Sequence, residues 1–415
     1  MTHSSVLAIP DFRQLWLGQA VSQLGDAIYF LIFMFMVDRI TGNPAMVGYV
    51  GAIQSLPYLL LGPYAGVIAD RVDRRRVMLF ADITSAILLG GLAAWLIVDP
   101  TPPIALVFVT AGSLSLVNVF FAPAKSAAIP RLVPTDRLME ANALSAATQN
   151  AMPILGLAFS GTVLGLLFQV AEDWFFFAAV TANALTFLVS AGYIARLPRI
   201  RPDRPDGPPQ AWADTRDGFR YVRRHPILLS VLASSALMNL AISPFFVVYV
   251  VINRQWFDGQ YSTLAAIDLA FFVGMVATSL YIGRHPVHRT GIAYLLGLGG
   301  SGLCIVAMAF SPHFWPFLLW NLLCGFILPY AQVPLSTYLQ LSVPDAFRGR
   351  VNAAVSMVSH GVVPVGAALA GMVLQRIGPV SMLLMIGAGF ALSGVVAYAN
   401  PRFRRARADD PPIAG

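Results

Sequence analysis

Charged residues are scarce in this chain of 415 residues: Asp, Glu, Lys and Arg together make up 11%. A soluble globular domain is about a quarter charged and roughly 45–50% apolar. Here 57% of the residues are hydrophobic and the mean hydropathy is +0.70. A soluble core of this composition would expose large apolar patches. The composition therefore excludes a soluble domain and predicts a polytopic, all-α membrane protein.

Cysteine and histidine are also rare, which removes several kinds of site. Both cysteines, Cys304 and Cys324, lie within apolar runs, so neither a disulfide framework nor a metal-ligand pair is indicated. The six histidines are scattered. The sequence contains no Walker loop, nucleophile elbow or H-E-x-x-H motif. We therefore expect no metal, no cofactor and no enzymatic activity.

The 27 basic residues comprise 26 arginines and a single lysine, Lys125. They lie in the connections between apolar runs and not on one face, which argues against a nucleic-acid partner. If both termini are cytoplasmic, only Arg39, Arg254 and Arg376 fall on the outer side, and 27 − 3 = 24 remain inside. Because basic loops stay inside, this asymmetry predicts an inner (plasma) membrane protein with both termini in the cytoplasm.

Apolar runs long enough to cross a bilayer, for which a helix needs about 20 residues, occur twelve times. They lie near residues 14–37, 45–69, 77–98, 104–124, 146–169, 174–195, 227–252, 262–283, 290–310, 316–339, 351–374 and 379–400. The predicted outer connections carry Trp95, Trp174, Trp256 and Trp315, as in an interfacial aromatic belt. We therefore predict twelve transmembrane helices.

A proline-rich stretch divides the chain into two halves. We predict a six-helix bundle at 1–197, a cytoplasmic linker at 198–226, a second six-helix bundle at 227–401 and a cytoplasmic tail at 402–415. The prolines stop before 211–224, where Trp212, Phe219 and Val222 share a helical face. This pattern predicts a short amphipathic helix on the membrane surface, in contact with membrane lipids.

The two halves are related by an internal repeat with an offset of 210 residues. The offset aligns Gly156 with Gly366 and Gly161 with Gly371, which places matching glycines on the fifth and eleventh helices. Small residues at such positions permit close packing of helices. Two related six-helix bundles predict a substrate site near the membrane midplane, between the halves.

A dense cluster of charges, residues 66–76, connects the second and third runs with the sequence G-V-I-A-D-R-V-D-R-R-R. This resembles the loop G-x-x-x-D-R-x-G-R-R between helices 2 and 3 of the major facilitator superfamily. The matching residues are Gly66, Asp70, Arg71, Arg74 and Arg75, and Asp73 replaces the second glycine. The resemblance implies a gate: we expect Gly66 to permit close packing of helices, and Asp70 and the arginines to clamp onto the second half in one transport state.

Other motifs resemble the branch of this superfamily that contains macrolide-efflux and enterobactin-exporter proteins. They are S-Q-L-G-D at 22–26, A-P-A-K at 122–125, I-P-R-L-V-P at 129–134 and R-G-R-V at 348–351. The resemblance implies the major facilitator fold, made of two pseudo-symmetric six-helix bundles. Two departures put drug:proton antiport in doubt, because the fourth run lacks an arginine and the glycine of the fifth run, Gly156, is not followed by proline.

Ionisable residues within the predicted spans are candidates for proton coupling, because a charge in lipid is costly unless it faces a cavity or a partner. Asp26 lies in the middle of the first run, Asp268 lies about 10 Å inside the eighth, and His360 lies in the eleventh. Burial at the midplane disfavours the ionised form of Asp26. Asp26 and His360 could instead serve helix packing alone, and Asp268 could simply be wetted from the outside. Asp82, near the inner end of its run, is expected to pair with the arginine-rich loop.

Neutral polar residues in the same runs are candidates for lining the substrate cavity, although each could simply join two helices by a hydrogen bond. The candidates are Gln23, Tyr29, Gln54, Asn118, Gln149, Asn150, Asn239, Asn321 and Gln332. Lys125 joins them as a cation that would meet an anionic substrate group, and its alternative is to snorkel to the interface.

These observations predict a monomeric secondary transporter that alternates between inward-open and outward-open states and exports an amphipathic small molecule, driven by protons. The G-D and P-A-K motifs at 25–26 and 123–125 also resemble lysophospholipid transporters, so a lipid substrate is the alternative. A receptor or scaffold that has the transporter fold and moves nothing is a further alternative.

Overall fold

The computed structural model describes residues 5–69, 71–201, 211–285, 287–343, 351, 355, 357–358 and 361–407. The chain divides into two compact units. Unit 1 comprises residues 1–42 and 53–211, and unit 2 comprises residues 43–52 and 212–415. Asp70, His360 and the R-G-R motif at 348–350 lie outside the described residues, so the predictions made for them remain predictions.

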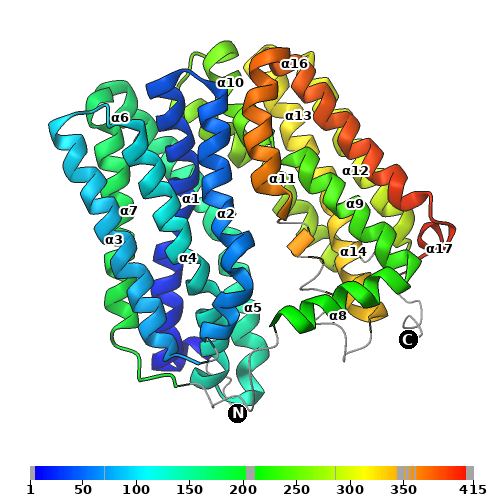
Figure 1. Cartoon of the computed structure of the whole chain (residues 1–415), viewed down its shortest axis with the longest axis horizontal. Helices are drawn as coiled ribbons and strands as arrows, with labels where there is room; N and C mark the ends of the chain where they lie inside the picture. The colour runs from blue at the N-terminus through cyan, green and yellow to red at the C-terminus, as the bar shows by residue number, and fades with distance from the viewer. Residues whose placement is uncertain are drawn as a thin grey trace. The chain divides into compact units, whose positions relative to one another are not determined.

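Long helices make up unit 1 (Figure 1). They are α1 (Pro10–Thr41), most of α2 (Pro44–Ala69), α3 (Arg74–Val98), α4 (Ile104–Leu132), α5 (Leu138–Phe159), α6 (Gly165–Val170) and α7 (Glu172–Ile194). A π-helical turn, η3 (Ser160–Leu164), joins α5 to α6, and short 3₁₀ turns η1 (Val6–Ala8) and η2 (Thr135–Arg137) precede α1 and α5. Within the unit, α1 packs against α7 and α5, and α3 packs against α7 and α4.

Unit 2 contains the remaining helices (Figure 1). They are α8 (Ala211–Arg224), α9 (Pro226–Ile242), α10 (Phe245–Trp256), α11 (Tyr261–Arg284), α12 (Thr290–Ala309), α13 (Phe314–Ile327), α14 (Pro329–Ser342), α16 (Val363–Tyr398) and α17 (Pro401–Arg404). Here α12 packs against α16, α13 and α14, α11 packs against α13, and α9 packs against α16. The first turns of α2 also belong to this unit.

Eleven candidate membrane spans occur among the described residues, each long and apolar enough to cross a bilayer. One of these spans, α16, contains the last two of the twelve runs predicted from the sequence, because it comprises two helical segments that meet at a kink. Gly378 interrupts it with φ 76° and ψ 169°, a conformation that glycine adopts readily, and Pro379 follows. The predicted all-helical transmembrane fold is confirmed.

Local sequence signals explain where several helices begin and end. Proline occupies the first turn of α1, α9, α14, α16 and α17, where its missing N–H costs nothing. Gly42, at φ 59°, closes α1, and its N–H donates to the Asp38 carbonyl over 2.7 Å. The Asp73 carboxylate caps α3 by accepting the Arg75 N–H over 3.1 Å.

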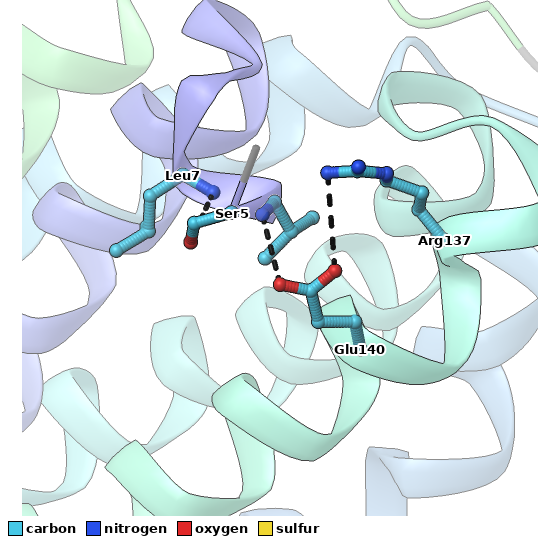
Figure 2. Close-up of polar contacts among 5 residues, drawn as sticks. Ser5, Leu7, Arg137 and Glu140 are labelled. Atoms are coloured by element: carbon cyan, nitrogen blue, oxygen red, sulfur yellow. Dashed lines mark hydrogen bonds and ion pairs between the residues drawn. The ribbon is translucent and has the colours of Figure 1, made fainter. Parts of the chain in front are cut away.

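A hydrogen bond connects the N-terminal segment to α5 (Figure 2). A Glu140 carboxylate oxygen accepts the Val6 N–H over 2.9 Å, and its other oxygen lies 4.0 Å from Arg137. The Ser5 hydroxyl accepts the Leu7 N–H and so caps the 3₁₀ turn. Val6 is buried in the same apolar cluster as Phe12 and Ala141. The segment before α1 is therefore part of the unit 1 core.

Helix α8 occupies the residues for which the sequence predicts an amphipathic helix. Its Tyr221 and Val222 side chains are buried in a cluster with Leu228, Val343 and Val351. Helix α8 therefore packs Val222, and in part Phe219, against other residues of unit 2, and its contact with membrane lipids stays a prediction.

Candidate functional site

The interior of unit 1 contains an acidic group near the middle of α1. The Asp26 Oδ1 atom is buried and has no hydrogen-bond partner among the described residues. The preceding residue, Gly25, packs so closely on α7 that an added Cβ would overlap the side chains of Asn183 and Thr186. Glycine therefore lets α1 approach α7 and fixes the position of the Asp26 carboxyl inside the bundle.

Two tyrosine hydroxyls lie within electrostatic range of this carboxyl, and an amide lies beside one of them. Tyr29 and Tyr58 lie close enough to Asp26 to interact with it electrostatically, and Gln54 lies beside the Tyr29 hydroxyl. That hydroxyl donates to the Ala111 carbonyl over 3.0 Å. Both amide atoms of the Gln54 side chain are buried without a hydrogen-bond partner among the described residues. Unused donors and acceptors of this kind are available to a ligand.

A second buried carboxyl lies on α3. Asp82 is 0% exposed, and neither of its carboxylate oxygens has a hydrogen-bond partner within the described part of the chain. Ser190 of α7 lies beside it, and Asp26 is near enough to repel it. An ionised carboxyl in an apolar interior requires a cation or several donors. Asp26 and Asp82 therefore mark a place suited to a proton, a cation or a donor group of a substrate.

The expected pairing of Asp82 with the arginine-rich loop is wrong. Arg74 is buried and donates from Nε to the Ala69 carbonyl over 3.1 Å and from Nη1 to the Ala127 carbonyl over 2.9 Å. Arg75 donates to the carbonyls of Ile194 and Ala195. These carbonyls lie at or near the C-terminal ends of α2, α4 and α7, where a positive charge complements the helix dipole.

The arginines at 74 and 75 thus stabilise helix ends within unit 1. A Cβ added at Gly66 meets no described atom within 4 Å, so no close packing of helices is seen there, and the role of Gly66 in the gate stays a prediction. Arg71 is exposed. The clamp formed by Asp70 stays a prediction, because Asp70 lies outside the described residues.

Unit 2 holds a smaller polar cluster. The Tyr249 hydroxyl of α10 donates to Asn321 Oδ1 of α13, and Asn321 Nδ2 donates to the Ile267 carbonyl of α11 over 2.6 Å. Asp268, the next residue, is 5% exposed and lies within electrostatic range of Tyr249. The structure thus brings two predicted residues, Asp268 and Asn321, to one place through a tyrosine that the sequence analysis did not select.

Other candidates fall into separate groups. Asn118 accepts a long hydrogen bond of 3.4 Å from Ser85, and Asn239 donates to the Ser235 carbonyl over 2.8 Å. The Gln23 Oε1 atom is buried without a partner among the described residues, as for Gln54. Gln149 and Gln332 are exposed, and the side chain of Asn150 lies outside the described part.

Lys125, the only lysine, is 8% exposed and lies on α4 beside the core residues Ala124 and Ala128. Among the described residues no carboxylate lies within ion-pair distance of its ammonium group. The alternative of snorkelling to water does not fit this burial. Lys125 is a buried cation near one end of unit 1.

Asp82, Tyr58 and Ser190 were not predicted as site residues. A signal was present, because Met78, Asp82, Ser85 and Leu89 recur at helical spacing and all four are buried. That spacing assigns Asp82 to the interior face of α3 and away from the loop.

Known proteins resemble this chain over most of its length. A family model described as Major Facilitator Superfamily matches residues 15–367. Macrolide efflux protein A of Streptococcus pyogenes is 23% identical over 381 residues, covering 91% of this chain and 92% of the relative. The putative bacilysin exporter BacE of Bacillus subtilis (strain 168) is 25% identical over 345 residues, covering 82% and 83%.

Solved structures with the same fold include the nucleoside transporter NupG, with a TM-score of 0.70 at 13% identity, covering 94% of this chain and 98% of the other. A POT family transporter in complex with 5-aminolevulinic acid gives a TM-score of 0.72 at 11% identity, covering 94% and 96%.

Proposed function

Because the chain belongs to the Major Facilitator Superfamily, we propose that it is a secondary transporter that exports an amphipathic small molecule in exchange for protons. The chain is a multi-pass membrane transporter and not an enzyme. The resemblance to macrolide-efflux proteins found in its motifs is confirmed across 91% of the chain. Export is supported by the names of these relatives, and the proposed position of both termini in the cytoplasm is supported by the distribution of arginines.

The observation that carries the proposal is the buried Asp26 carboxyl, which lacks a hydrogen-bond partner for Oδ1 among the described residues. A carboxyl in this setting takes up a proton when its surroundings are dry and releases it when they are wetted. Alternation between two conformations with different proton affinities is what couples a proton gradient to transport. Asp26 is the proposed coupling residue, with Asp268 as the corresponding candidate in unit 2.

The proposed substrate is a largely neutral compound of the drug or siderophore-like kind, with apolar and polar parts. Around Asp26 the available groups are the rings and hydroxyls of Tyr29 and Tyr58 and the amides of Gln23 and Gln54. Aromatic surface suits an apolar ligand, and a few amides and hydroxyls orient it. A macrolide is the first compound to test, because macrolide efflux protein A is among the relatives.

The test is transport in proteoliposomes that contain the purified protein. With a proton gradient imposed, we expect a labelled macrolide or another amphipathic dye to accumulate on the acidic side, and a protonophore to abolish the accumulation. Lipid vesicles without protein are the control. Substrate movement that is independent of the proton gradient would refute proton coupling. Absence of movement for a broad panel of amphipathic compounds would favour the receptor or scaffold alternative.

The alternative substrate, a lysophospholipid, is favoured by one observation. Lys125 is a buried cation without a carboxylate partner among the described residues, and a phosphate head group would satisfy it. Movement of a fluorescent lysophospholipid, lost in Lys125→Met and retained in Lys125→Arg, would support this alternative over drug export.

A further inference from the structure

Exposed arginines gather at one end of unit 2. They come from three segments that are far apart in the sequence: the end of α8, the residue before α12, and the region of α17. All six side chains are exposed, and we call them the basic cluster: Arg223, Arg224, Arg289, Arg402, Arg404 and Arg405. Arg404 lies over the Tyr398 ring, with 5.8 Å between its guanidinium carbon and the ring centroid.

Hydrogen bonds from Asn400 bring the first and third segments together. Asn400 Nδ2 donates to the Pro226 carbonyl over 2.9 Å and to the Ser230 hydroxyl over 3.2 Å. The Oδ1 atom of the same side chain caps α17 by accepting the N–H groups of Arg402 and Phe403. Arg223 and Arg224 form the end of α8, and the next helix, α9, is hydrogen-bonded to Asn400 at the start of α17. These two arginines therefore lie at the same end of unit 2 as α17, where Figure 1 shows the junction of α8 and α9.

The second segment is joined to the third through Gly291. Its N–H donates to the Ala406 carbonyl over 3.4 Å, and an added Cβ would overlap the carbonyl oxygens of Phe403 and Arg404. The Phe403 ring is fully buried and contacts Tyr294 edge-to-face, with 5.6 Å between centroids. Arg289 is thereby placed at the same end as the arginines of α17.

Acidic groups do not neutralise this cluster within the described part of unit 2. The acidic side chains described there are Asp258 and Asp268. Asp258 follows α10, at the far end of the α9–α10 span from Pro226, and Asp268 is buried within α11. Six positive charges with no carboxylate among the described neighbouring side chains create a positive potential, and the N-terminal ends of α9 and α12 add to it.

Exposed apolar side chains continue from the cluster along the membrane spans. Leu229 lies one turn into α9 and is 46% exposed, and Leu296 of α12 is 65% exposed. Leu392 and Val395, near the end of α16 that leads into α17, are 53% and 55% exposed. A charged end followed by an apolar flank matches a phospholipid, whose phosphate lies at the ends of membrane spans and whose acyl chains lie beside them.

We propose that the basic cluster is a binding site for an anionic phospholipid, which places its phosphate among the arginines and its acyl chains along α9, α12 and the end of α16. The site consists of unit 2 residues alone and includes none of the unit 1 residues to which proton coupling is assigned. It requires only that α9, α12 and α16 span the membrane, so it does not depend on the substrate or on the coupling ion.

The experiment uses native mass spectrometry of the purified full-length protein, incubated with equal amounts of phosphatidylglycerol and phosphatidylcholine. The test variant carries Arg224→Gln, Arg289→Gln and Arg402→Gln, one substitution in each segment. The matched control carries Arg76→Gln, Arg199→Gln and Arg201→Gln, three exposed arginines of unit 1. Thermal midpoints in detergent establish that both variants are folded. If the triple test variant cannot be purified as folded protein, the single variant Arg289→Gln replaces it.

We expect the unmodified protein to bind more phosphatidylglycerol than phosphatidylcholine. The ratio of the two bound lipids should fall at least about tenfold in the test variant and stay unchanged in the control. The single variant is expected to lose about threefold of the preference. Leu296→Gln should weaken phosphatidylglycerol retention through the acyl chains. An equal loss in both triple variants would overturn the proposal in favour of diffuse attraction between lipid and any arginine. Displacement of the lipid by millimolar inorganic phosphate would overturn it in favour of a free anion site.

Discussion

Unit 1 and unit 2 differ in the hydrogen bonding of their buried polar side chains. In unit 1, carboxyl oxygens of Asp26 and Asp82 and both amide atoms of Gln54 have no hydrogen-bond partner among the described residues. In unit 2, the Ser234 hydroxyl bonds both Tyr294 and the Ser393 carbonyl, and Asn321 bonds both Tyr249 and Ile267. The unpartnered atoms described in unit 2 belong to neutral hydroxyl and amide groups.

Under the proposed function, this difference assigns different roles to the two units. A polar network in which every group is hydrogen-bonded fixes one arrangement of helices. A buried carboxyl without a partner is tolerated only if a proton, a ligand or water interacts with it in some state of the protein. The difference suggests that unit 1 carries the exchangeable proton or ligand, and that unit 2 supplies a more fixed surface. The experiments below test this division, beginning with the largest expected effect.

The first prediction compares the central acidic residues of the two units. Asp26→Asn keeps the size of the side chain and removes its titration, so we expect gradient-driven transport to fall by about 100-fold or more while gradient-independent substrate exchange continues. Asp268→Asn should reduce driven transport much less. Transport in proteoliposomes with and without a proton gradient measures both. If Asp268→Asn is the more damaging variant, the coupling residue is in unit 2 and the division is reversed.

The second prediction compares stability in the two interiors. Asn321→Leu leaves the Tyr249 hydroxyl without its acceptor and removes the hydrogen bond to the Ile267 carbonyl, which should destabilise the fold by about 2 kcal/mol. Asp82→Leu removes a buried carboxyl that has no partner among the described residues, so it should raise the thermal midpoint in detergent. A fall in the midpoint for Asp82→Leu, similar to that for Asn321→Leu, would show that Asp82 is satisfied in the folded protein.

The third prediction concerns the arginines of the two units. Arg74→Gln removes charged hydrogen bonds to the carbonyls of Ala69 and Ala127 and should destabilise the protein by about 2 kcal/mol. Arg289→Gln changes an exposed side chain and should alter the stability by less than about 0.5 kcal/mol in lipid-free detergent. Thermal unfolding followed by size-exclusion chromatography compares them. Equal midpoints for the two variants would mean that the carbonyl contacts of Arg74 contribute little.

The fourth and smallest effect concerns glycines in the third span of each unit. On α12, an added Cβ at Gly302 would meet the Gly387 carbonyl oxygen at 2.6 Å, so Gly302→Ala should cost about 1–2 kcal/mol. On α3, Gly90 has open space around it, and Gly90→Ala should stabilise the helix by about 0.5 kcal/mol. Opposite shifts of the thermal midpoint are expected. A loss of stability in Gly90→Ala would indicate that this face of α3 is packed in the membrane.

Much of the fold could be predicted from the sequence because membrane spans are set by composition over about 20 residues. The runs predicted at 45–69, 174–195 and 290–310 correspond to helices at Pro44–Ala69, Glu172–Ile194 and Thr290–Ala309. The position of Asp26 near the middle of a span followed from the same reasoning. The break at Gly378 within α16 also agrees with the predicted boundary between the runs at 351–374 and 379–400.

The parts of the candidate site that escaped prediction depend on side-chain direction. Asp82 was expected to pair with arginines that are near it in the sequence. In the structure Asp82 is buried inside the bundle, and Arg74 and Arg75 donate hydrogen bonds to carbonyls at helix ends. The contact of Tyr249 with Asn321 links residues 72 positions apart in the chain. Sequence spacing along one helix can assign a face, but it cannot identify which residue of another helix lies opposite.

The burial of Lys125 has a practical consequence for following the folding of this protein. Because the chain contains one lysine, an endoprotease specific for lysine has a single cleavage site, and an amine-reactive dye has one side-chain target besides the N-terminus. That site lies within α4 with 8% of the residue exposed, so the folded protein protects it. Cutting or labelling at Lys125 therefore reports the opening of unit 1 directly, without the introduction of any probe.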